Sequence, residues 1–121
     1  ALSAGRYEET YRRARRVRRA VTRDLLGAFE GGVDALLAPT TAGPAFRLGE
    51  RTEDPRAMYR SDRFTVAANL AGVPAISIPA GTAEGLPVGV QLMSPPWAEE
   101  EMLSLAARLE ELAAFEPPEP A

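Results

Sequence analysis

The middle of the chain most constrains the fold, because helix signals there are followed at once by strand signals. A short helix is predicted over residues 63–70, since a glycine and a proline soon after it stop the periodic pattern. Two apolar runs follow, at residues 75–79 and 88–93. The segment that joins them, residues 81–87, contains Gly and Pro. We therefore predict a hairpin of buried strands connected by a loose loop.

Helix periodicity appears at both ends of the chain. Apolar residues recur every three or four positions over residues 7–29, and a last helix with an acidic first turn is predicted over 99–113. Residues 35–38 have the pattern of a strand ended by proline, and residues 40–55 are typical of a surface loop. The chain is predicted to be α/β, with about three helices and three strands. More sheet is expected outside these residues, because the apolar strands exceed what the helices can cover.

The residue types that most catalytic and metal sites need are missing. The sequence contains no His, no Cys and no Lys. A serine nucleophile needs a base within hydrogen-bond reach, and only carboxylates are available for that role. His and Cys are also the usual ligands of structural zinc. We assign no catalytic residue, no metal ligand and no bound cofactor to this chain.

Arginine supplies all 14 basic residues, and several of them form a row on the first predicted helix. The row consists of Arg12, Arg15, Arg16, Arg19 and Arg23. Such a row can neutralise the phosphates of a nucleic acid. However, the formal net charge is −3, acidic residues accompany the arginines, and no aromatic residue alternates with them. A solvated helix face is therefore favoured, and direct nucleic-acid contact is not expected.

Arg18 differs from the row, because it falls within the apolar stripe of the same helix. Burying it alone would be costly. It is expected either to pair with a carboxylate, such as Asp34 or Asp62, or to extend to a solvent edge.

Asp62 is the acidic residue whose position suggests either a structural or a ligand-binding function. It stands at the start of the helix predicted over residues 63–70, after a loop rich in Gly and Pro. Its carboxylate could cap that helix, or it could bind a cationic group of a ligand. From the residues alone the cap is favoured, because Asp is among the preferred capping residues, and Ser61 offers the same function. Ser77, within a strand, is expected to be a satisfied polar position rather than a nucleophile.

Motifs spread over nearly the whole chain resemble those of the amidase signature family. In order they are ALSAG at residues 1–5, YxxxYxxAxxVR at 7–18, APT at 38–40, PAF at 44–46, DP at 54–55, MY at 58–59 with Asp62, NLAG at 69–72, PxISxP at 74–79 and GLPVGVQL at 85–92. The spacing MYxxD before NLAG is most similar to the A subunits of aspartyl/glutamyl-tRNA amidotransferases.

The resemblance implies the C-terminal part of a three-layer α/β/α fold around a large mixed sheet. It also implies a mechanism with a nucleophilic Ser, a bridging Ser and a Lys base, all upstream of these residues. No catalytic residue is carried over. In the A subunits an Asp at the position of Asp62 holds the α-ammonium of glutamine, so the resemblance favours substrate binding over capping.

In those enzymes the A subunit releases ammonia to a partner subunit, which amidates an ATP-activated Glu-tRNA or Asp-tRNA. The resemblance thus implies B and C subunits as partners, and ATP and Mg²⁺ used by the partner rather than by this chain. Two other functions stay open. One is the C-terminal piece of a stand-alone amidase with a different amide substrate, and the other is a non-catalytic scaffold or interaction module.

We expect one unit over residues 1–121, the C-terminal fragment of an amidase-signature domain, with a frayed proline-rich tail over 115–121. Its apolar runs are much shorter than the roughly 20 residues that cross a bilayer, so a cytoplasmic parent is expected. The isolated chain is predicted to be inactive. Its exposed apolar strands are expected to bind the upstream part of the same protein or to drive self-association.

Overall fold

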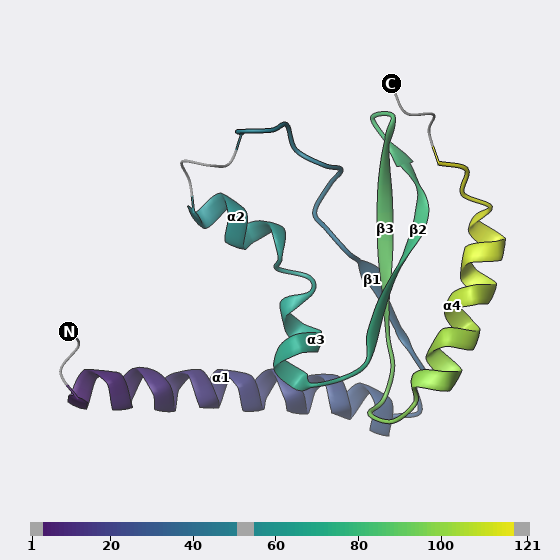
Figure 1. The fold of residues 1–121 in the computed structure, drawn as a ribbon. Coiled ribbons are helices and arrows are strands. Elements are labelled where there is room, and N and C mark those ends of the chain that lie inside the picture. The colour runs from purple at the N-terminus through teal and green to yellow at the C-terminus, as the bar shows by residue number, and fades with distance from the viewer. Residues whose placement is uncertain (1–3, 51–54, 118–121) are drawn as a thin grey trace.

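The computed structural model describes residues 4–50 and 55–117, which form four helices and a three-stranded sheet (Figure 1). In chain order the elements are α1 (Ala4–Glu30), β1 (Leu36–Pro39), α2 (Pro55–Ser61), α3 (Val66–Ala71), β2 (Ala75–Ala83), β3 (Leu86–Met93) and α4 (Glu99–Ala113). None of the helices in this part of the chain is long and apolar enough to cross a membrane.

The strands pair in the order β1-β3-β2, and both pairings are antiparallel. β3 is therefore the central strand. Gln91, near its middle, pairs with Ala38 of β1 and with Ser77 of β2. Successive residues of a strand point to opposite faces, so β3 presents Leu92 to one side of the sheet and Gln91 and Met93 to the other.

Helix α4 covers the first face of the sheet. Leu92 of β3 is 2 % exposed and packs with Ile78 of β2 and with Met102 and Ala106 of α4. The two helix residues lie four positions apart, on one side of α4. Figure 1 shows α4 running alongside the hairpin. Burial of a leucine side chain of this kind stabilises the fold by about 1.5–3 kcal/mol.

The second face packs on α3 and on the C-terminal part of α1. Met93 of β3 lies with Ala68 and Val73 in a buried cluster, and Leu25 and Phe29 of α1 pack against it. The sheet therefore has helices on both faces, which makes three layers. The N-terminal half of α1 extends past the other elements (Figure 1), and Tyr7 and Tyr11 on it are more than half exposed.

Most of the predicted elements are confirmed, but the segment before β2 is not. The helix predicted over residues 63–70 is present as α3, but it begins later than predicted, because the chain forms α2, a turn at residues 62–65, and then α3. Thr65 occupies the N-cap position of α3. Asp62 therefore does not cap α3, and α2 makes four helices where about three were expected.

The hairpin is tighter than the loose loop predicted over residues 81–87. β2 continues to Ala83 and β3 begins at Leu86, so only Glu84 and Gly85 form the turn. Both residues have positive φ, 55° and 77°. Positive φ at both central positions is typical of the type I′ turn, whose twist matches that of the flanking strands. A register shift between Pro79 and Gly81 marks a β-bulge in β2. Residues 118–121 of the expected frayed tail lie outside the described residues.

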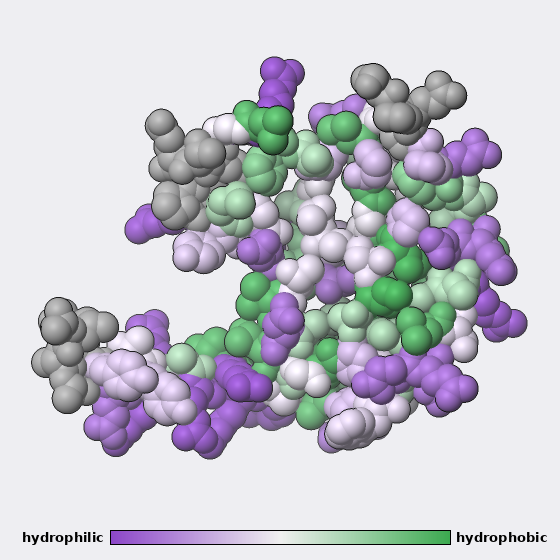
Figure 2. Space-filling view, viewed as in Figure 1, coloured by the Kyte–Doolittle hydropathy of each residue, from purple (hydrophilic) through white to green (hydrophobic). Residues whose placement is uncertain are grey.

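The arginine row lies on the exposed face of α1, where Figure 2 shows hydrophilic side chains along the helix. Arg12 pairs with Glu8 at 2.6 Å, and Arg23 lies 3.7 Å from Asp24. Both pairs are well exposed, so they contribute little to stability.

Arg18 joins α1 to α3 through the backbone. Its Nε donates a hydrogen bond of 2.8 Å to the carbonyl oxygen of Leu70, near the end of α3. Of the two expected alternatives, the described residues show no carboxylate partner at Asp34 or Asp62, whereas the extension to a solvent edge is confirmed, because the side chain is exposed. The bond satisfies a carbonyl that the helix end leaves without an intrahelical partner.

Replacing Arg18 with Met is expected to lower the free energy of unfolding by about 0.5–1.5 kcal/mol, because one hydrogen bond between α1 and α3 is lost. Chemical denaturation of the protein measures the change. Arg16→Met is the matched control, since Arg16 lies on the solvent face of the same helix. Equal effects of both substitutions would contradict a specific role for Arg18.

Candidate substrate pocket

Along β3, the second face of the sheet changes from apolar to polar and then to a glycine without a side chain. Met93 lies in the apolar cluster under α1 and α3, Gln91 in the middle is 3 % exposed and polar, and Gly89 at the far end has no side chain. These three residues alternate along one strand and so share a face. The face therefore runs from a packed core to an open recess.

Gly89 lies against a pair of hydroxyl groups. Oγ1 of Thr40, just after β1, and Oγ of Ser77 on β2 are 2.7 Å apart and share a hydrogen bond. The amide of Thr40 also donates to the carbonyl oxygen of Gly89 at 3.1 Å. A Cβ at position 89 would lie 2.9 Å from the Ser77 Oγ, which is closer than real Cβ contacts. Gly89 is thus required for the close approach of three strands at this point, and Ser77 is a satisfied polar position as predicted.

A hollow of about 750 Å³ opens above this hydroxyl pair. Its walls are residues 40–47 of the loop after β1, Ser61 at the end of α2, and residues 84 and 86–89 of the hairpin. Arg47 and Glu50 add a charge of each sign, and the Arg47 amide donates to Glu50 Oε2 at 2.9 Å. The lining is therefore mixed polar and apolar, as in sites that bind small polar molecules.

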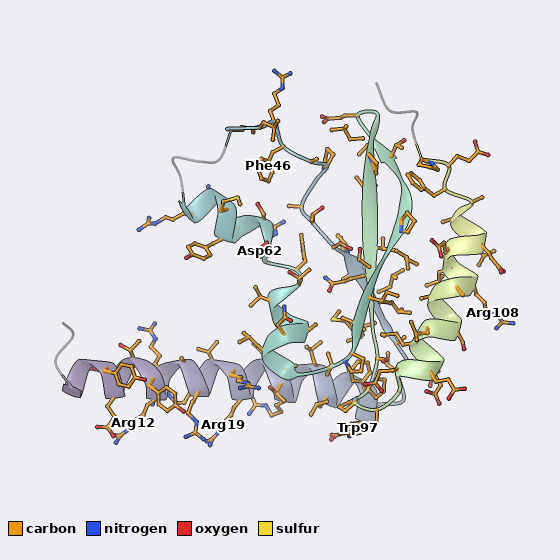
Figure 3. All side chains as sticks on the ribbon, in the orientation of Figure 1. Arg12, Arg19, Phe46, Asp62, Trp97 and Arg108 are labelled. Carbon is orange, nitrogen blue, oxygen red and sulfur yellow. The ribbon has the colours of Figure 1, made fainter. Side chains whose placement is uncertain are left out.

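Asp62 follows Ser61 directly and lies at the end of α2, with Phe46 on the facing loop (Figure 3). Its carbonyl oxygen accepts hydrogen bonds from the amides of Thr65 and Val66 at 3.0 and 3.1 Å. Among residues 4–50 and 55–117, its carboxylate has no hydrogen-bond or ion-pair partner, and the residue is exposed. The backbone of Asp62 is thus used by the turn, whereas its charge is available to a ligand.

Gln91 connects this turn to the sheet. Its side-chain Nε2 donates to the carbonyl oxygen of Phe64 at 2.8 Å and to that of Pro39 at 3.0 Å. Phe64 belongs to the turn that carries Asp62, and Pro39 ends β1 where the loop of the hollow begins. Sequence reasoning did not assign Gln91 or Gly89 a role. The available signals were a glutamine and a glycine within an otherwise apolar strand.

The described residues do not assemble an activated nucleophile. The Ser77 hydroxyl pairs with another hydroxyl, and the buried Ser94 hydroxyl contacts backbone carbonyl oxygens of Pro95 and Ala98. Neither arrangement includes a base. Within the same residues, no group of three acidic side chains is placed to hold a metal ion. The described residues thus offer a recess lined with polar and apolar groups, without an activated nucleophile.

A family model described as Amidase matches residues 1–103 of the chain. The chain belongs to the amidase family. Similar curated relatives include the A subunit of glutamyl-tRNA(Gln) amidotransferase from Pseudomonas putida (strain W619), 48% identical over 112 residues, which are 93% of this chain and 23% of the relative. The corresponding protein from Salinispora arenicola (strain CNS-205) is 50% identical over 119 residues, 98% of this chain and 24% of the relative. This amidase chain thus spans about a quarter of the length of the relatives that it matches.

Solved structures agree with the family assignment. The A subunit of glutamyl-tRNA(Gln) amidotransferase from Thermotoga maritima has a TM-score of 0.76 and 39% identity, covering 97% of this chain and 25% of that one. A 6-aminohexanoate cyclic dimer hydrolase has a TM-score of 0.74 and 26% identity, covering 96% of this chain and 26% of that one. The predicted α/β fold of the amidase signature family is confirmed.

Proposed function

We propose that this chain forms the C-terminal part of a glutamine-hydrolysing A subunit of a tRNA-linked amidotransferase. The observation that carries the proposal is identity of about half to such A subunits over nearly the whole chain. In this proposal residues 1–121 are one fragment of an amidase-signature domain. They supply scaffold and part of the substrate pocket, and the Ser-Ser-Lys catalytic residues come from the upstream part of the protein.

Within this proposal Asp62 binds the α-ammonium group of glutamine. Its exposed carboxylate, which has no partner within residues 4–50 and 55–117, supports the assignment, because such a carboxylate can pair with a cation. Asp62 is not itself among the residues that line the hollow, but its neighbour Ser61 is, which supports a role for this turn near the pocket. A charge-assisted pair of this kind would favour amides with a free α-amino group over simple amides.

The released ammonia would pass to a partner subunit that amidates a tRNA-bound Glu or Asp. ATP and Mg²⁺ would be bound by that partner, and B and C subunits would complete the enzyme in the cytoplasm. The exposed apolar residues of α1, including Tyr7, Tyr11 and Val17, support an extensive interface with chain outside these residues. Without that cover the fragment is expected to self-associate.

The test is ammonia release from glutamine by two polypeptides, the 121-residue chain and the same chain extended upstream to the length of its relatives. The extended protein is expected to turn over glutamine. The 121 residues alone are expected to show no turnover above the uncatalysed rate, because they lack Lys and a serine with a base. Turnover by the short chain, abolished by mutation of one of its own serines, would contradict the proposal.

A stand-alone amidase of the same family is the second candidate. The structural similarity to a 6-aminohexanoate cyclic dimer hydrolase favours it, since that enzyme has the same local fold. Such an enzyme would hydrolyse an amide that lacks an α-amino group at least as fast as glutamine. The extended protein is expected to prefer glutamine. A non-catalytic scaffold, the third candidate, would hydrolyse neither.

A further inference from the structure

Gln91 is almost fully buried, yet its amide group makes no contact with the hollow. It is 3 % exposed and lies at the centre of the sheet, where both neighbours along β3 are apolar. An amide buried among apolar side chains is costly unless its hydrogen-bonding groups are satisfied. Both hydrogens of the NH₂ group have an acceptor, the carbonyl oxygens of Phe64 and Pro39.

The two acceptors belong to segments that have no strand pairing with each other. Pro39 leads into the loop of the hollow, and Phe64 lies two residues after Asp62 in the turn between α2 and α3. Because both acceptors are carbonyl oxygens, only the nitrogen end of the amide can face them. One side chain therefore joins the turn that carries Asp62 to the start of the loop that lines the hollow.

Within residues 4–50 and 55–117, the side-chain hydrogen bond that joins this turn to β3 comes from Gln91. The turn's own hydrogen bonds at Asp62, Thr65 and Val66 are local, and they hold its shape without placing it against β1 or β3. By contrast, the Gln91 bond to Phe64 joins residues that are 27 apart in the chain, and the bond to Pro39 joins residues 52 apart. Tightly held supporting side chains of this kind determine how accurately a binding group is placed.

We infer that Gln91 is a positioning residue, which holds the turn that carries Asp62 at a fixed place relative to the pocket loop. The effect that we expect on glutamine binding rests on the proposed function, in which glutamine binds through Asp62. Loss of the tie leaves the carboxylate present but displaced, so recognition of the α-ammonium weakens. Hydrolysis of an amide without an α-amino group does not depend on Asp62 and is unaffected.

The test uses the protein extended upstream to the length of its relatives, called the full-length protein, and the substitution Gln91→Met. This substitution keeps side-chain length and removes both donors. We expect the KM for glutamine to rise about threefold to tenfold, with kcat and the kinetics on glutaramate, the analogue without the α-amino group, unchanged. In an Asp62→Asn background the same substitution should have no further effect on the KM, because both changes disable one interaction. Additive effects, or equal effects on both substrates, would overturn the inference.

Hydrogen exchange tests the tie independently of activity. In Gln91→Met the amides of residues 40–47 and 62–66 should exchange faster, whereas those of α4 should not. Unchanged exchange in both segments would overturn the inference, whatever the activity of the protein. Failure of the unsubstituted protein to hydrolyse glutamine would reject the proposed function but not the positioning role of Gln91. If Gln91→Met does not fold, Gln91→Asn is measured in the same way. It keeps the NH₂ group on a side chain shorter by one methylene, so the tie is weakened.

Discussion

Asp62→Asn in the full-length protein is expected to raise the KM for glutamine about tenfold to a hundredfold and to leave the melting temperature almost unchanged. The first effect follows because the substitution removes the negative charge that pairs with the α-ammonium, a charge-assisted hydrogen bond of about 1.5–3 kcal/mol. The second follows because, in the described part of the chain, hydrogen bonds are made by the backbone of Asp62 and not by its carboxylate. Steady-state ammonia release and thermal unfolding measure the two quantities.

Two controls isolate the charge at position 62. Glutaramate, which lacks the α-amino group, should be hydrolysed with similar kinetics before and after the substitution. Asp24→Asn removes an exposed carboxylate of α1, far along the chain from the pocket, and should change neither KM nor melting temperature. If Asp62→Asn lowers stability and leaves the glutamine KM unchanged, Asp62 is a structural residue and the proposed substrate contact is wrong.

Gly89→Ala is expected to lower the free energy of unfolding by about 1–3 kcal/mol, the usual range for forcing an extra methyl group into a well-packed site. The new Cβ would lie 2.9 Å from Ser77 Oγ, 3.2 Å from the carbonyl oxygen of Ile78 and 3.4 Å from Thr40 Oγ1. The serine cannot turn away without losing its bond to Thr40, and the carbonyl belongs to the sheet. Urea denaturation of the full-length protein measures the loss.

Gly27→Ala provides the matched control, because it adds the same methyl group in open space. No atom lies within 4 Å of a Cβ at this position, which is inside α1. Alanine there should stabilise the protein by about 0.5–1 kcal/mol through helix propensity. Adding Ser77→Ala to Gly89→Ala should recover part of the loss, since it removes the nearest clash. A neutral Gly89→Ala would show that the three strands have room to separate.

The sequence predicted those elements whose signals are local and repeated. α1 and α4 have apolar residues at helical spacing over many turns, and their predicted spans agree with the structure to within a few residues. α2 was missed because it is 7 residues long and begins at a proline that follows a loop rich in Gly, Pro and Thr. The start of α3 was misplaced because Ser61 and Asp62 both resemble helix caps, whereas the observed N-cap is Thr65.

The pocket was only partly predictable, for a different reason. Asp62 was found through its place in a family motif, and its role remains a prediction. The tie made by Gln91 and the bond from Arg18 to Leu70 could not be predicted, because both end on backbone carbonyl oxygens far away in the chain. A carbonyl group is present at every residue, so side-chain types give no indication of which one will accept a bond. Arg18 is an example of that limit, because its sequence context suggested a carboxylate partner or a solvent edge and gave no indication of the Leu70 carbonyl oxygen.

The bulge in β2 determines where this domain tolerates a change in length. A residue added to β3 between Gly89 and Met93 would exchange the two faces of the strand on one side of the insertion, and would turn a buried leucine away from α4 or a buried glutamine toward it. The register shift between Pro79 and Gly81 separates that segment from the tip of the hairpin. Insertions and deletions among family members should therefore occur mainly at the hairpin tip, beyond the bulge. There the hairpin can vary in length, while the segment of β3 from Gly89 onward keeps the same length.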